Sequence, residues 1–174
     1  MPQASKHMEW CLNKAKKEIG ECKKLGKRPK HRGLLKVEPN IDDAKKHLAK
    51  AEHNLNGITR FKEIGFSDWS MSAGFYCVYH CFPAIAAKFG YESANQTCTI
   101  ALIKYLKENN KIQLDEKFIE LLEYEEISEN SIIDLREDYT YGVRTSVEDE
   151  TKLNSLKKTC KEVIDITKQI VYDD

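Results

Sequence analysis

The sequence has little glycine or proline and no long apolar run. Only 8 Gly and 4 Pro occur in 174 residues, so few positions break regular structure. No segment approaches the roughly 18 apolar residues of a membrane span, and the N-terminal residues lack the apolar stretch of a signal peptide. No segment alternates convincingly with the period of two that marks a strand. These absences predict a cytoplasmic, helical protein that does not enter membranes.

The six cysteines do not resemble a disulfide framework, because nothing in the chain indicates export. They are Cys11, Cys22, Cys77, Cys81, Cys98 and Cys160. Cys77, His80 and Cys81 share one helical face and would supply half of a metal site. No second Cys/His pair stands nearby in the sequence, so a packed helix face is the better interpretation. We therefore predict no metal and no cofactor.

Apolar residues recur every three or four positions along most of the chain, the spacing of amphipathic helices. Asn40 is the expected N-cap of the helix that follows it, and Ser67 of the next. Pro83 should kink that next helix. The fold class is therefore all-α, an up-and-down bundle of about four long helices plus short ones. The expected helices cover about 4–25, 41–64, 67–88, 96–108, 115–124, 128–139 and 145 or 146 to the C-terminus.

Charge is divided unevenly, although the formal net charge is zero. Residues 1–40 contain 11 Lys and Arg against 4 Asp and Glu, a net +7, and residues 41–174 therefore carry −7. The basic stretch includes Lys27, Arg28, Lys30 and Arg32. It either binds an anionic partner or lies across the acidic part of its own fold. We divide the chain into a basic extension, 1–40, and a helical bundle, 41–174.

Two segments have an unusual composition for core helices. The first, 69–80 (WSMSAGFYCVYH), mixes small residues with polar aromatic ones, including Tyr76. The second, 135–139 (LREDY), crowds Arg136, Asp138 and Tyr139 near the end of an apolar helix. Together with 41–55 (IDDAKKHLAKAEHNL) and 88–91 (KFGY), they resemble the HEPN family in order and spacing. The resemblance covers residues 41 to about 171.

The resemblance implies a helical protein of a toxin–antitoxin or defence module, often encoded beside a minimal nucleotidyltransferase. Many members are metal-independent ribonucleases, in which an arginine is followed after four to six residues by a histidine. The arginine would stabilise phosphate charge and the histidine would transfer the proton. Here the arginine is Arg136, and no histidine follows it. Tyr141 stands at a permitted position, but a tyrosine with a pKa near 10 is a poor base at neutral pH.

Three interpretations remain open. In the first, the motif is degenerate and the protein binds RNA, a nucleotide or a cognate nucleotidyltransferase. In the second, it is an active endoribonuclease that pairs Arg136 with Tyr141 or His80. In the third, it is a non-catalytic, dimeric interaction module. We expect a homodimer formed through Ser72, Ala73, Gly74, Tyr76 and Tyr79.

Overall fold

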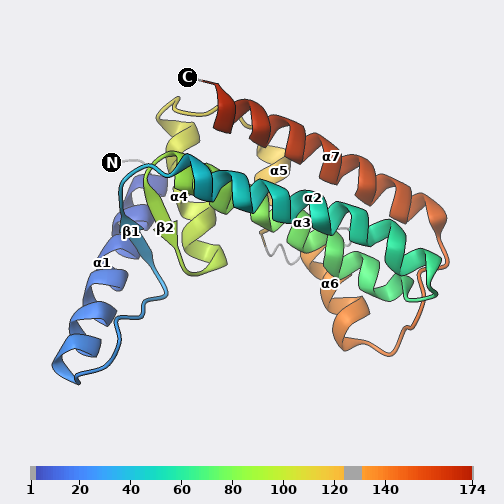
Figure 1. Cartoon of the computed structure of the whole chain (residues 1–174), viewed down its shortest axis with the longest axis horizontal. Coiled ribbons are helices and arrows are strands. Elements are labelled where there is room, and N and C mark those ends of the chain that lie inside the picture. The colour runs from blue at the N-terminus through green and yellow to red at the C-terminus, as the bar shows by residue number, and fades with distance from the viewer. Residues whose placement is uncertain (1–2, 124–130, 174) are drawn as a thin grey trace.

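The computed structural model describes residues 3–123 and 131–173, which form helices and one pair of short strands (Figure 1). The elements in chain order are α1 (Gln3–Lys24), β1 (Leu34–Lys36), α2 (Ile41–Glu63), α3 (Ser67–Lys88), β2 (Tyr91–Ser93), α4 (Gln96–Glu108), α5 (Glu116–Glu120), α6 (Ile132–Tyr141) and α7 (Glu150–Tyr172). The fold is an all-α bundle, as the sequence predicts. Its long helices are α2, α3 and α7, and a fourth long helix, α1, belongs to the N-terminal extension.

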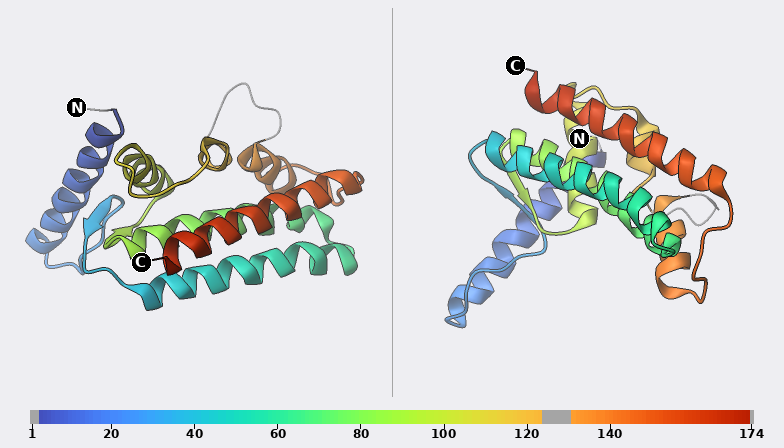
Figure 2. Two further views of the ribbon diagram at one scale, coloured as in Figure 1. Left: turned by 90° about the horizontal axis from the view of Figure 1, so that it is seen from above. Right: turned by 45° about the vertical axis from the view of Figure 1, so that its right-hand side comes forward.

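Helix α3 is the centre of the bundle. It packs against α2, α4, α6 and α7, and Figure 2 shows α4, α5 and α6 in a row on the side of α3 opposite α2. Most of its residues are buried, and the helix continues across Pro83. Because α3 meets neighbours on several sides, it has no single apolar stripe of the kind found on α1 and α7.

The small residues of α3 let its neighbours approach closely. A Cβ atom on Gly74 would lie 2.6 Å from the side chain of Leu156 on α7. Ala73 is buried and faces Gly57 on α2, and Ser72 bonds to Thr140 on α6. Ser72, Ala73 and Gly74, which were expected on a dimer surface, are therefore used by the chain's own helices. Only the tyrosines of that set stay partly exposed.

The structure contains two strands that the sequence pattern does not predict. β1 and β2 pair antiparallel, with Leu34 opposite Ser93 and Lys36 opposite Tyr91. Each strand has three residues, too few for an alternating pattern to stand out. Gly90, with φ +76°, forms the turn between α3 and β2 and lies against Val37 and Pro39.

The N-terminal extension is fastened to the bundle. Helix α1 packs on α4, and Cys11 forms a disulfide with Cys98, their Cα atoms 5.7 Å apart. The sequence predicts no disulfide framework, and this one pairing corrects that expectation for Cys11 and Cys98. Gly33 lies so close to α1 that a Cβ atom there would be 2.8 Å from the backbone nitrogen of Ala15. The pairing joins residues 87 positions apart, and spacing alone does not indicate it.

Some helix boundaries differ from the expected ones. Asn40 caps α2 as predicted, but Ser67 lies inside α3, where its hydroxyl accepts the backbone N–H of Val147. The last helix begins after Asp149, not at residue 145 or 146. The expected start of the sixth helix, Ser128, falls outside the described residues. Within the described part of the chain, no helix is both long and apolar enough to cross a membrane.

Candidate functional site

Arg136 lies on α6, which packs against α3. Ser131 caps α6 by accepting the backbone N–H of Asp134. Further along, the Arg136 guanidinium carbon lies 4.5 Å from the ring centre of buried Phe75, while Thr140 bonds to Ser72 at 2.7 Å. This contact between a cation and an aromatic ring is attractive and holds the guanidinium against Phe75. Phe75 therefore positions Arg136, a role that the sequence alone does not indicate.

Described residues use little of the hydrogen-bonding capacity of Arg136. Its side chain is 20% exposed, and its only ion pair among the described residues is a long one, 3.6 Å to Glu137. Its Nε is buried and has no hydrogen-bond partner within the described part of the chain. A guanidinium offers five N–H donors in a planar fork that fits the oxygens of a phosphate or carboxylate. Arg136 is therefore held in place, while most of its donors have no partner among residues 3–123 and 131–173.

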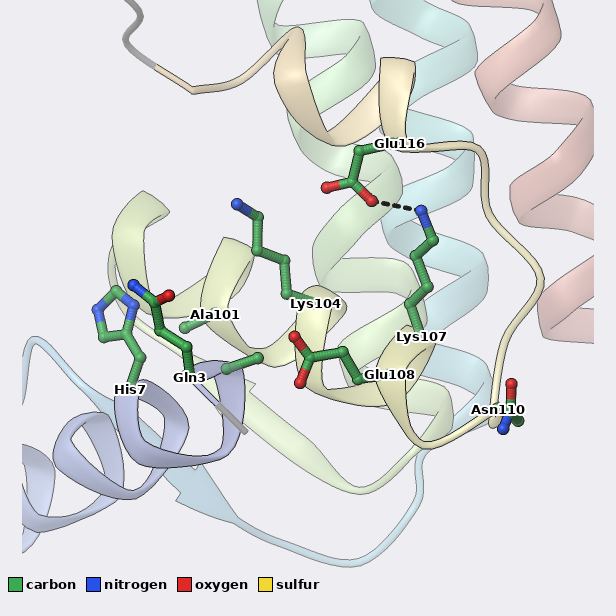
Figure 3. Close-up of a pocket in the computed structure, with 9 residues that line it drawn as sticks. Gln3, His7, Ala101, Lys104, Lys107, Glu108, Asn110 and Glu116 are labelled. Atoms are coloured by element: carbon green, nitrogen blue, oxygen red, sulfur yellow. Dashed lines mark hydrogen bonds and ion pairs between the residues drawn. The ribbon is translucent and has the colours of Figure 1, made fainter. Parts of the chain in front are cut away.

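Arg136 borders a hollow of about 430 Å³ between α1, α4 and α6. His7, Gln96 and Lys104 also line this hollow, and Lys104 pairs with Glu123 at 2.6 Å. A neighbouring hollow of about 470 Å³ shares His7 and Lys104 (Figure 3). There Lys107 is bonded to Glu116. The two hollows together carry charges of both signs, and the lysines that line them are paired with carboxylates.

The other candidates on α6 point in different directions. Tyr139 is buried, with the Arg144 guanidinium 5.8 Å from its ring centre. Asp138 is exposed, and its backbone carbonyl accepts the N–H of Gly142 at the end of the helix. Tyr141 is 75% exposed at the same end. The structure therefore gives Tyr139 a packing role and leaves Tyr141 in solvent.

His80 faces α2 and pairs with another histidine, which the sequence did not single out. Its Nδ1 lies 3.1 Å from Nδ1 of His47, and the two rings stack. Burial, followed by the neighbouring His47, lowers the pKa of His80 to about 4, and burial also lowers the pKa of His47. Both imidazoles are therefore neutral at pH 7. No spacing rule links positions 47 and 80, which only the packing of α2 on α3 brings together.

His80 and Arg136 do not meet in this chain. Arg136 lies against Phe75, Phe75 stacks on Tyr79 with ring centres 6.1 Å apart, and the Tyr79 ring meets His80 edge-on. Two aromatic rings thus separate the candidate acid–base group from the candidate phosphate-binding group. Burial raises the pKa of Tyr79.

The thiols of α3 turn away from His80. Cys77 and Cys81 are buried, and a hydrogen bond with Cys160 of α7, together with burial, raises the pKa of the Cys77 thiol. Burial likewise raises the pKa of Cys81. Among residues 3–123 and 131–173, no group of three His, Cys, Asp or Glu is placed to hold a metal ion.

Exposed aromatic residues lie beside the Arg136 region. Trp69 is 50% exposed and Tyr76 45% exposed, and they stand seven residues apart on α3, so both fall on one face of the helix. Ser72, between them, is bonded to α6. The predicted binding residue Tyr76 is therefore accessible, and Trp69 extends the apolar surface around it.

The basic residues of the extension lie on the loop after α1, and Figure 1 shows this loop far from α6, the helix that carries Arg136. Arg32 is held by Glu18, which accepts its backbone N–H and pairs with its guanidinium at 3.3 Å. Lys27, Arg28 and Lys30 are exposed and form no ion pair with any described residue. The structure therefore divides the predicted binding residues between two separate places.

Comparison with known protein families identifies the family to which the bundle belongs. The HEPN domain family matches residues 44–171. The chain belongs to the HEPN family. HEPN domains are often partnered with a nucleotidyltransferase. The match begins within α2, so α1 and β1 lie outside it. No curated protein matches the chain.

Proposed function

We propose that this HEPN protein is a binding component of a toxin–antitoxin or defence module, with a degenerate ribonuclease motif. It holds a phosphate-bearing ligand, RNA or nucleotide, at Arg136 and acts together with a nucleotidyltransferase. The observation that carries the proposal is the state of Arg136, which is fixed against Phe75 with its Nε unpartnered among the described residues. Such a group can bind a phosphate, but it cannot move a proton.

The surroundings of Arg136 favour binding over cleavage. RNA cleavage without a metal needs a group that accepts and returns a proton within hydrogen-bond reach of the reacting oxygen. Tyr141 projects into solvent at the end of α6, and His80 is engaged with His47. Losing a positioned acid–base group lowers the rate by about 10² to 10⁴. Cleavage should therefore be very slow compared with a HEPN nuclease whose motif is intact.

The exposed Trp69 and Tyr76 favour a second role for the same region, as a protein interface. Aromatic residues are enriched where proteins associate, and these two lie next to the helix that carries Arg136. We expect them to contact a second copy of this chain, which would place two Arg136 residues near one interface. Sedimentation of wild type and of the Trp69→Ser/Tyr76→Ser variant checks this. A monomer mass at tens of micromolar that does not change with concentration contradicts the dimer.

The test of function compares Arg136→Ala with Arg144→Ala, since Arg144 also lies over an aromatic ring but is exposed. Binding of ATP and of a single-stranded RNA is measured, together with cleavage of that RNA. Hydrogen bonds to charged groups contribute about 1.5–3 kcal/mol, so Arg136→Ala should weaken binding of at least one ligand roughly tenfold or more. Arg144→Ala should bind as wild type does.

Cleavage is the outcome that contradicts the proposal. We expect no appreciable cleavage by wild type, Tyr141→Phe or His80→Ala, with or without a metal chelator. Rapid cleavage by wild type that is lost in Arg136→Ala and in either other variant would instead establish an active endoribonuclease.

A further inference from the structure

Helix α1 carries a stripe of side chains on its solvent side. Trp10, Lys14, Lys17, Glu21 and Lys24 follow one another at steps of four and three residues, which places them on one helical face. With a rise of 1.5 Å per residue, the stripe is about 21 Å long. The opposite face, with Met8, Cys11 and Ala15, is buried against the bundle. The stripe therefore faces outward.

Trp10 is the unusual member of this stripe. Its side chain is 53% exposed, although α1 has ample buried positions. The ammonium of Lys14 lies 5.0 Å from its ring centre. A hollow of about 400 Å³ beside Trp10 is lined by Asn13, Lys14, Lys17, Glu18 and Glu21, and Glu18 is paired with Arg32. A large flat ring beside two cations is what a nucleic-acid base and its phosphates require.

The loop after α1 carries further exposed basic side chains. Between Glu21 and Glu38 the chain has no acidic residue, and Lys24, Lys27, Arg28 and Lys30 are all exposed. Glu18 neutralises Arg32, so that residue belongs to the scaffold of the loop and not to its free charge. The cations therefore run from the middle of α1 into the loop.

The extension is held rigidly enough to present this surface. The disulfide Cys11–Cys98 and the β1–β2 pairing attach it to the bundle on both sides of the loop, and Gly33 brings the chain back into close contact with α1. A surface that is fixed before binding loses less conformational entropy on binding.

We infer that α1 and the loop that follows it form a binding surface for single-stranded RNA, with Trp10 as the platform on which a base stacks and Lys14, Lys17, Lys24, Lys27, Arg28 and Lys30 as phosphate contacts. An anionic membrane fits less well, because the apolar face of α1 is already buried and none remains to insert. An acidic peptide would use the cations but not the exposed ring. This surface is separate from the Arg136 site.

The test measures binding of a labelled single-stranded RNA of about 16 nucleotides over a series of salt concentrations. Base stacking on an aromatic residue contributes about 1–3 kcal/mol, so Trp10→Ala should weaken binding roughly five- to a hundredfold with the salt slope unchanged. Trp10→Phe should retain most of the affinity. Removing three cations in Lys27→Ala/Arg28→Ala/Lys30→Ala should reduce the slope of log K against log salt by about 2.

The control variant removes equal charge elsewhere, in Lys45→Ala/Lys46→Ala/Lys50→Ala on the exposed side of α2, and should bind as wild type does. Equal affinity of Trp10→Ala and wild type for the single-stranded RNA overturns the inference. It is also overturned if wild type binds duplex RNA or anionic vesicles more tightly than the single-stranded RNA and Trp10→Ala weakens that binding. Competition by polyglutamate that persists in Trp10→Ala would indicate an acidic protein instead. Binding lost in Arg136→Ala but kept in Trp10→Ala would overturn this inference and support the proposed function.

Discussion

The bundle and the N-terminal extension are held in different ways. The bundle is built around α3, whose small residues allow α2 and α7 to pack closely on it. The extension instead depends on a few local attachments, which are one disulfide, a ladder of three residue pairs and the contact of α1 with α4. Packing spreads stability over many contacts, whereas the extension concentrates it at a few positions. Single changes should therefore affect the two regions differently.

The largest expected effect comes from the disulfide, which closes a loop with a sequence separation of 87. In the chain-entropy description, a cross-link of this span stabilises the folded state by about 4.5 kcal/mol. Reduction should lower the free energy of unfolding by about that amount, measured by denaturant titration of the oxidised and reduced protein. It should also increase proteolysis in the loop at 23–32 while the bundle stays protected. Cys22→Ala, which removes an unpaired cysteine, serves as control, and identical midpoints would contradict the prediction.

The next largest effect is expected from a substitution that disturbs the close packing of the bundle. Gly74→Ala places a methyl group against Leu156 and should destabilise the protein by about 1–3 kcal/mol, the usual result of overpacking. Gly57→Ala is the matched control, because its new Cβ atom would lie 3.6 Å from Ala73, an ordinary contact. There the gain in helix propensity should stabilise by about 0.5–1 kcal/mol. Thermal or urea unfolding of both variants checks the opposite signs.

The smallest expected effect concerns the His47–His80 pair within the bundle. The pKa of His80 is about 4 in the folded protein, against 6.5 for an unperturbed histidine. The unfolded chain therefore binds more protons between these values, so stability is complete above pH 6.5 and falls as the pH drops toward 4. Because the pair is partly exposed, solvent screening reduces the loss to about 1 kcal/mol. His80→Phe should flatten this part of the pH profile, whereas His53→Gln, at an exposed position, should not.

Most of the fold could be predicted from the sequence because it depends on local patterns. Apolar spacing predicts the helices, Asn40 caps α2, and Gly26, with φ +62°, lies just beyond the end of α1. The patterns that predict a helix and its cap involve residues three or four positions apart, so a helix can be predicted without knowing how the rest of the chain folds. Local patterns do not predict the short strands, because each has three residues and pairs with a strand more than fifty positions away.

The sequence by itself also determined the absence of a histidine after Arg136, and with it the expectation of a degenerate motif. Only the tertiary structure decided what surrounds that arginine, because Phe75, on another helix, holds its guanidinium. It likewise decided that His80 pairs with His47 and that Cys11 joins Cys98. These pairs join residues 33 or more positions apart, and no local spacing rule specifies which distant helix faces will pack together.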